Sequence, residues 1–128
     1  MLLLGWMRVR SLKWALIALI TLALLYMSWP KFELFQCRSV QSEAKAWLTH
    51  LYEAEKFYYA HHHQYASLEM LLQKGLVKSS EKNYTYHTFQ YDTQSFEMRA
   101  ISKNLDHDIW SVNQTGKIRA IHDACPLP

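Results

Sequence analysis

The 128-residue chain has few of the residues that mark catalytic or nucleic-acid-binding proteins. It contains only three glycines, and none forms a Gly-rich loop that could hold a phosphate. No two carboxylates are spaced for acid–base catalysis. The net charge is only +3, and beyond residue 30 the basic residues alternate with acidic ones instead of forming a basic stripe. The sequence therefore predicts a non-enzymatic protein with no cofactor and no nucleic-acid partner.

Charge is missing altogether from residues 14–29, sixteen consecutive positions. As a helix this run spans about 24 Å, and apolar residues on both sides extend it toward the ~30 Å core of a bilayer. Three basic residues precede the run: Arg8, Arg10 and Lys13. Basic residues favour the cytoplasmic side of a membrane. We therefore expect residues 1–13 to be a cytoplasmic basic segment, residues 14–29 a transmembrane helix, and residues 30–128 an extracytoplasmic domain.

This arrangement corresponds to a single-pass protein of the bacterial inner membrane with its C-terminal domain in the periplasm. The alternative is a signal peptide that is cleaved and leaves a secreted binding domain. The run ends in "YMSWP", which contains no small-residue cleavage pattern, so we favour the uncleaved anchor.

The chain has only two cysteines, Cys37 and Cys125. In an exported domain such a pair predicts one disulfide. A loop of this length could contribute about 4–5 kcal/mol through the entropy of the unfolded chain. Two unpaired thiols, or a Cys37 that pairs between chains, are the alternatives. Cys125 could also act as a nucleophile with His50 or His122 as its base, but a disulfide explains the cysteine better.

Beyond Pro30 the apolar residues recur at spacings of three and four, as on one face of a helix. These positions are Val40, Ala44, Trp47, Leu48, Leu51, Ala54 and Tyr58. A proline kinks a helix without necessarily ending it. We therefore expect one long helix from about residue 10 to residue 62.

The second half of the chain has the signals of a short helix followed by strands. In "SLEMLLQKG", Ser67 is a candidate N-cap and Gly75 a candidate stop. Four segments have β-type composition: 84–91, 95–102, 109–113 and 117–121. The predicted fold class is α+β, with a long N-terminal helix (a membrane half and an amphipathic half) packed on a small antiparallel β-sheet.

The order of these features resembles the type IV pilin and pseudopilin family over nearly the whole chain. "PKFELFQCRSVQSEAKAWL" (30–48) is similar to the segment after the helix proline of these proteins, including the Ser42-Glu43 pair. "YEAEKFYYAHHHQYASLEMLLQKGLV" (52–77) resembles their helix end and αβ-loop, and "DHDIWSVNQTGKI" (106–118) resembles their terminal hairpin.

The resemblance implies a pilin-like fold and a minor or accessory component of a type IV pilus or a type II secretion-like system. Its partners would be the membrane and other pilin-like subunits that contact the N-terminal helix. Five residues are expected to take part in helix packing: Pro30, Glu43, Trp47, Leu48 and Leu51.

The N-terminus departs from the family. Registering the chain on Pro30 places Arg8 where pilins carry the glycine that the prepilin peptidase requires. It places Lys13 where they carry a glutamate that neutralises the free amine of a neighbouring subunit. A cation facing a cation is unfavourable in a low-dielectric core. We therefore expect no pilin-type processing. The alternative function is a free-standing, membrane-tethered binding or sensing domain on a pilin-like scaffold.

Two groups of residues suggest a metal. Three consecutive histidines at 61–63 point in three directions on a helix, so a solvated helix end is the simpler interpretation. Asp106 and Asp108 lie in a loop where some pseudopilins hold calcium. Without a clear third ligand they are only candidates, and an acidic turn before Ile109 is the alternative.

Overall fold

The structure is a computed structural model that describes residues 2–125. Residue 1 of the predicted cytoplasmic segment and residues 126–128 of the predicted outer domain lie outside the described residues. The elements are α1 (Leu2–His62), α2 (Leu68–Gln73), β1 (Tyr84–Tyr91), β2 (Phe96–Ser102), β3 (Ile109–Asn113) and β4 (Ile118–His122). The chain divides into two compact units, Met1–Gln36 and Cys37–Pro128.

Helix α1 is longer than the sequence predicts. It begins at Leu2 instead of near residue 10 and passes through Pro30 without interruption. Proline removes one backbone N–H from the helix, and the hydrogen bonds of the neighbouring turns are enough to continue it. The described residues of the first unit are therefore all helical, while the second unit contains the end of α1 and every element after it.

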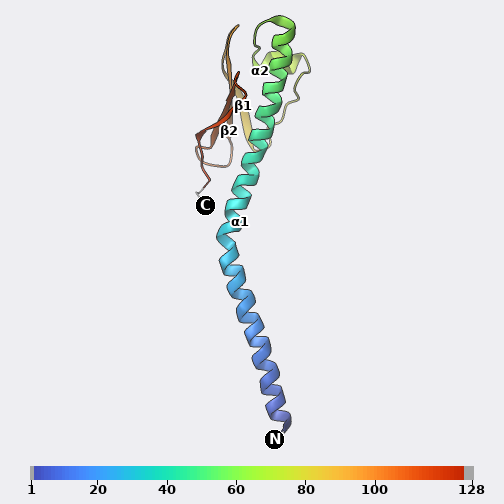
Figure 1. Ribbon diagram of the computed structural model, residues 1–128, viewed down its shortest axis with the longest axis vertical. Helices are drawn as coiled ribbons and strands as arrows, with labels where there is room; N and C mark the ends of the chain where they lie inside the picture. The colour runs from blue at the N-terminus through green and yellow to red at the C-terminus, as the bar shows by residue number, and fades with distance from the viewer. Residues whose placement is uncertain (1, 126–128) are drawn as a thin grey trace. The chain divides into compact units, whose positions relative to one another are not determined.

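The second unit is built on an antiparallel four-stranded sheet with the order β1-β2-β3-β4. Figure 1 shows this sheet, with β1 and β2 labelled, beside the C-terminal part of α1. Each strand pairs with the next one in sequence, so all connections are local turns. The turn between β3 and β4 requires Gly116, which has φ +75°. A Cβ at this position would lie 2.8 Å from the ring of Tyr52 on α1. Glycine is thus required twice here: it adopts the positive φ of the turn, and its missing side chain leaves room for the Tyr52 ring.

The core lies between one face of the sheet and the outer part of α1. Alternate residues on the strands point into it because successive side chains of a strand face opposite ways. The buried apolar residues of the sheet are Tyr84, Tyr86, Phe96, Met98, Ala100, Trp110 and Val112. The buried apolar residues of α1 are Ala44, Leu48, Leu51, Ala54 and Tyr58. This is the α+β, pilin-like arrangement predicted from the sequence.

Both predicted end signals of the short helix are present. The Ser67 hydroxyl accepts a hydrogen bond from the Met70 amide at 3.3 Å. Gly75 has φ +70° and follows the C-cap residue. Its amide bonds to the Leu72 carbonyl, and the next amide bonds to the Leu71 carbonyl, both at 3.1 Å. These two bonds form a Schellman motif, which ends a helix where glycine can adopt a positive φ.

A disulfide joins Cys37 on α1 to Cys125 near the C-terminus, with a Cα–Cα distance of 5.8 Å. It closes a loop across 88 positions and links the first turn of the second unit to its last described residue. Because Cys125 is bonded, it is not a thiol nucleophile, which removes the Cys–His alternative.

Reducing this disulfide should destabilise the second unit. Replacing Cys37 and Cys125 together by serine should lower the free energy of unfolding by up to about 4–5 kcal/mol, because the unfolded chain regains the entropy of an open loop. Thermal unfolding of the full-length protein in detergent, followed by near-UV circular dichroism with and without reductant, measures this. The double variant is the control, since reductant should leave its melting temperature unchanged. An equal melting temperature for reduced and oxidised wild type would contradict the assignment.

Candidate assembly helix and buried polar cluster

The first unit presents a continuous apolar surface. Among the described residues, one helix is long and apolar enough to cross a membrane, and it is α1. Its large side chains are exposed, for example Leu19, Leu22 and Leu25 at 68–70%. Such a surface is unfavourable in water and requires either lipid or other apolar helices around it.

The threonine and the serine within this run have their hydroxyl groups hydrogen-bonded to the helix itself. The Thr21 hydroxyl reaches the carbonyl oxygens of Ile17 and Ala18 at 3.0 and 2.9 Å. The Ser28 hydroxyl donates to the Leu24 carbonyl at 2.8 Å. In lipid an unsatisfied hydroxyl would be costly, so these bonds let the helix reside in a bilayer without a polar partner helix.

The predicted helix-packing residues are not equivalent. Leu48 and Leu51 are completely buried in the core. Glu43 is half-buried, and its carboxylate accepts hydrogen bonds from the Asn83 amide at 3.3 Å and the Asn83 side chain at 2.5 Å. It therefore fixes the loop before β1. Pro30 lies exposed in the first unit and contributes nothing to this core.

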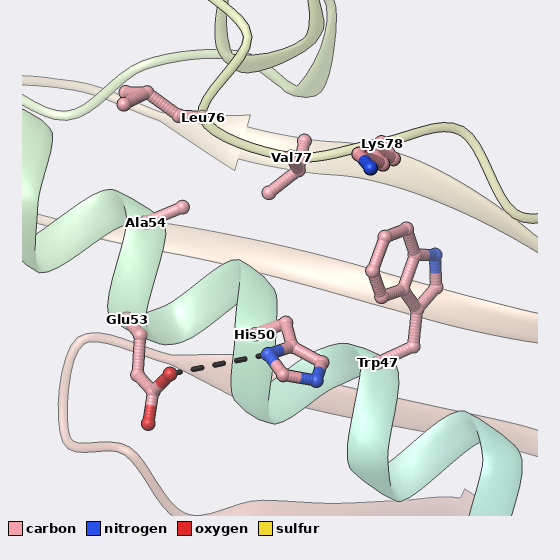
Figure 2. A pocket seen from close by; sticks show the side chains of 7 residues that line it. All are labelled: Trp47, His50, Glu53, Ala54, Leu76, Val77 and Lys78. Atoms are coloured by element: carbon pink, nitrogen blue, oxygen red, sulfur yellow. Dashed lines mark ion pairs between the residues drawn. The ribbon is translucent and has the colours of Figure 1, made fainter.

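Trp47 is half-buried and borders an open hollow of about 260 Å³ (Figure 2). Its indole meets Tyr86 edge-on at 5.9 Å and His50 at 5.8 Å. Figure 2 shows the segment from Leu76 to Lys78 on the opposite side of the hollow. Among the described residues that line the hollow, exposed His50 and Glu53 lie 3.9 Å apart, a contact that is ionic only when His50 is protonated.

The strongest polar cluster surrounds Asp108, which is 1% exposed. One carboxylate oxygen accepts hydrogen bonds from the Gln41 side chain and the Ala124 amide, both at 2.9 Å. The other accepts from the Tyr84 hydroxyl at 2.5 Å and the Trp110 ring N–H at 3.1 Å. Burial and the hydrogen bond to this carboxylate raise the pKa of Tyr84 above its usual range. Four donors thus replace the water that the carboxylate loses.

A second carboxylate extends the cluster to the C-terminal segment. Asp123 accepts hydrogen bonds from the side chains of Gln41 and Arg38, both at 2.7 Å. These two contacts lower its pKa to about 2. Gln41 is fully buried and bridges Asp108 and Asp123. The cluster therefore attaches residues 123–125 to α1, beside the disulfide.

The cluster bears on the calcium interpretation. Both oxygens of Asp108 face N–H and O–H donors, whereas a calcium ligand must face the cation. The Asp106 side chain is 93% exposed and contacts only His107, at 3.4 Å. Within residues 2–125 no three His, Cys, Asp or Glu side chains are placed to hold a metal. The Asp108 oxygens are thus occupied by protein donors, whereas the Asp106 side chain faces solvent.

Asp108→Ala should lower the free energy of unfolding by about 3 kcal/mol or more, because it leaves several buried donors without an acceptor. Urea unfolding of the full-length protein in detergent, followed by Trp fluorescence, measures this. Asp106→Ala is the matched control and should change stability by less than about 0.5 kcal/mol, since its side chain is exposed. If the two variants lost similar stability, the structural role assigned to Asp108 would be wrong.

Glu55 is a buried carboxyl group on α1 that the apolar pattern does not reveal. One oxygen accepts a hydrogen bond from the Ala66 amide at 2.9 Å, and the other has no partner among the described residues. Burial raises its pKa from 4.5 to about 7. The group holds the loop after α1 and is neutral in mildly acidic solution.

The raised pKa predicts that stability depends on pH. Below pH 4.5 the carboxyl group is protonated in both the folded and unfolded states. As the pH rises toward 7, only the unfolded state ionises, so the folded state loses up to about 3 kcal/mol. Glu55→Gln should remove this loss, which urea unfolding at pH 4.5, 6 and 8 would detect. Glu53→Gln is the exposed control and should behave as wild type; a pH profile unchanged by Glu55→Gln would contradict the assignment.

The three histidines lie where α1 ends. The rings of His61 and His62 are hydrogen-bonded to the carbonyl oxygens one turn earlier, at 2.9 and 3.2 Å. His63 has φ +55° and terminates the helix. The His61 and His62 rings therefore have separate contacts, and within residues 2–125 the three histidines are not placed to hold a metal together.

The sequence reasoning missed Gln41, Glu55 and the contact of Arg38 with Asp123. A signal for the first two was present: Gln41 lies three residues before Ala44, and Glu55 lies four after Leu51. Both therefore continue the spacing of the buried stripe. Nothing local indicated the ion pair, because its residues are 85 positions apart.

Comparison with known proteins finds the same fold but no close relative. No family model matches the sequence, and no curated protein sequence matches it. Among solved structures, the chain is similar to the non-core minor pilin PilV of Neisseria meningitidis, with a TM-score of 0.55. The match covers 72% of this chain and 95% of that chain at 17% sequence identity. The protein thus has a type IV pilin-like fold.

Proposed function

We propose that this pilin-like protein is a membrane-anchored, non-enzymatic accessory or minor component of a type IV pilus or a type II secretion-like system. Its first unit would lie in the bacterial inner membrane and its second unit in the periplasm. The observation that carries the proposal is the pilin-like packing of one long helix on a four-stranded antiparallel sheet.

The exposed apolar side of α1 supports a role in assembly. Its large side chains can contact either lipid or the equivalent helices of other pilin-like subunits. The second unit would then be displayed beside the membrane by a helix that is continuous from Leu2 to His62.

Arg8 and Lys13 favour a second candidate function. Without the glycine and the glutamate of the family pattern, the chain is a poor substrate for the prepilin peptidase and a poor ordinary filament subunit. The alternative is a free-standing, membrane-tethered binding or sensing domain. The internally satisfied hydroxyls of α1 support this alternative, because such a helix needs no neighbour in the bilayer.

Photocrosslinking in the native membrane distinguishes the two functions. A photoreactive residue in place of Leu22, which is 70% exposed, should form crosslinks to pilin-like or secretion subunits in the producing cell. The same substitution at Lys78, in the second unit, is the control for nonspecific contact. Crosslinks to lipid alone would refute the assembly function and support the tethered domain.

The processing prediction has its own test. Co-expression with a prepilin peptidase should leave the wild-type chain at its full length, since a bulky cation occupies position 8. Arg8→Gly should restore a mature form that begins at Val9, visible by N-terminal sequencing. Arg10→Gly is the matched control, because it removes the same charge at a position where the family needs no glycine. Cleavage of the wild type at Val9 would contradict the prediction.

A further inference from the structure

The face of the sheet opposite the core, here called the outer face, carries one continuous row of polar residues. His87 on β1 pairs with Arg99 on β2, and Arg99 pairs with Ser111 on β3. Ser111 in turn pairs with Arg119 on β4. Adjacent strands are about 4.8 Å apart, so the Cα atoms of Arg99 and Arg119 are about 10 Å apart, with Ser111 between them.

Arg99 is held in a fixed orientation. Its Nε donates to the Glu97 carboxylate at 3.0 Å, and its guanidinium carbon lies 3.4 Å from the centre of the Phe89 ring. Its side chain is 29% exposed. The two remaining nitrogens of the fork have no hydrogen-bond partner within residues 2–125. The stacking on Phe89 and the ion pair with Glu97 therefore orient the guanidinium group and leave its two terminal nitrogens as donors for a ligand.

The other members of the row are also available. Arg119 is exposed and makes neither a hydrogen bond nor an ion pair with any part of the chain that the structure describes. Ser111 is only 8% exposed, although it lies on the outer face. Its hydroxyl makes no hydrogen bond to another described residue. Donors from three adjacent strands thus lie in one row of the outer face, with Ser111 between the two arginines.

Two guanidinium forks and a hydroxyl form a site for an oxyanion, because arginine binds carboxylates and phosphates through paired hydrogen bonds. We propose that Arg99, Ser111 and Arg119 bind the carboxylate of an acidic side chain in a partner protein. The ion pair with Glu97 positions Arg99 and leaves Arg119 as the uncompensated charge.

The surroundings favour a protein carboxylate over a polyanion. Of the 14 basic residues four precede Cys37, and of the 11 acidic residues one does, so residues 37–128 carry ten of each. Such a unit has no basic stripe that could follow a chain of phosphates. The adjoining row contains Ile101, which is 38% exposed, paired with Ile109. Arginine beside apolar and aromatic residues is typical of protein–protein contacts.

The inference concerns the sheet and not α1, so it is independent of the proposed assembly function. A short blocked peptide, Thr-Ile-Glu-Ile-Thr, is titrated into the full-length protein in detergent micelles. The signals of the arginine Nε–H groups are followed by NMR. We expect saturable shifts of the Arg99 and Arg119 signals, and about tenfold or more weaker binding by Arg119→Gln.

Three controls decide the outcome. Lys117→Gln removes the same charge two positions away, outside the row, and should change the affinity by less than about twofold. Arg99→Lys keeps the charge but removes the fork and should weaken binding several-fold. The peptide with glutamine in place of glutamate should bind about tenfold more weakly or not at all.

Several results would overturn the proposal. The first is that the glutamine peptide binds as tightly as the glutamate peptide. The second is that Lys117→Gln and Arg119→Gln lower the peptide affinity equally. The third is that the peptide shifts neither arginine signal. A short single-stranded oligothymidylate that shifts the same two signals and binds more tightly than the peptide would also overturn it. The ligand would then be a nucleic-acid phosphate and not a protein carboxylate. Circular dichroism confirms that each variant is folded, which is expected for Arg119 because its side chain is exposed.

Discussion

The second unit depends on the buried carboxylate of Asp108. Its four hydrogen bonds come from α1, β1, β3 and the segment after β4, so one group ties together parts of the chain that are far apart in sequence. A buried carboxylate is tolerated only when its oxygens are satisfied, and this requirement fixes the positions of all four donors. The disulfide of Cys37 and Cys125 holds the same region covalently. The hydrogen bonds of Asp108 and the disulfide therefore both attach the C-terminal segment to α1, and the hydrogen bonds also attach the sheet.

Local patterns predicted the secondary structure well. Strands were expected at 84–91 and 109–113 and are found at those bounds, because turns and alternation act over a few residues. The apolar run was also readable, because it lies in the helix that is long and apolar enough to cross a membrane. The start of the helix was not, because the basic residues before Trp14 are as compatible with a helix as with a flexible arm.

The same patterns placed Gln41 and Glu55 on the buried stripe but did not show that these polar residues are buried. Gln41 and Glu55 occupy the buried stripe, but a polar residue on a helix is ordinarily assigned to solvent. Whether it is buried depends on partners such as Asp108 and the Ala66 amide, which only the folded chain brings near. Asp108 was only a weak calcium candidate in the sequence, which shows the carboxylate but not the donors around it. The sequence therefore did not determine which distant residues form hydrogen bonds with these buried polar groups.

Lys13 and the hydroxyl groups of Thr21 and Ser28 place different requirements on the surroundings of α1. In a filament core, Lys13 would meet apolar surface or another cation, which is unfavourable without a compensating acid. At a membrane surface the same side chain can extend its amine into the headgroup region at little cost. Thr21 and Ser28 add no polar demand, because both are satisfied within the helix. The exposed apolar side chains of α1 fit either lipid or pilin-like helices, so Lys13 is the residue that weighs between the two proposed functions.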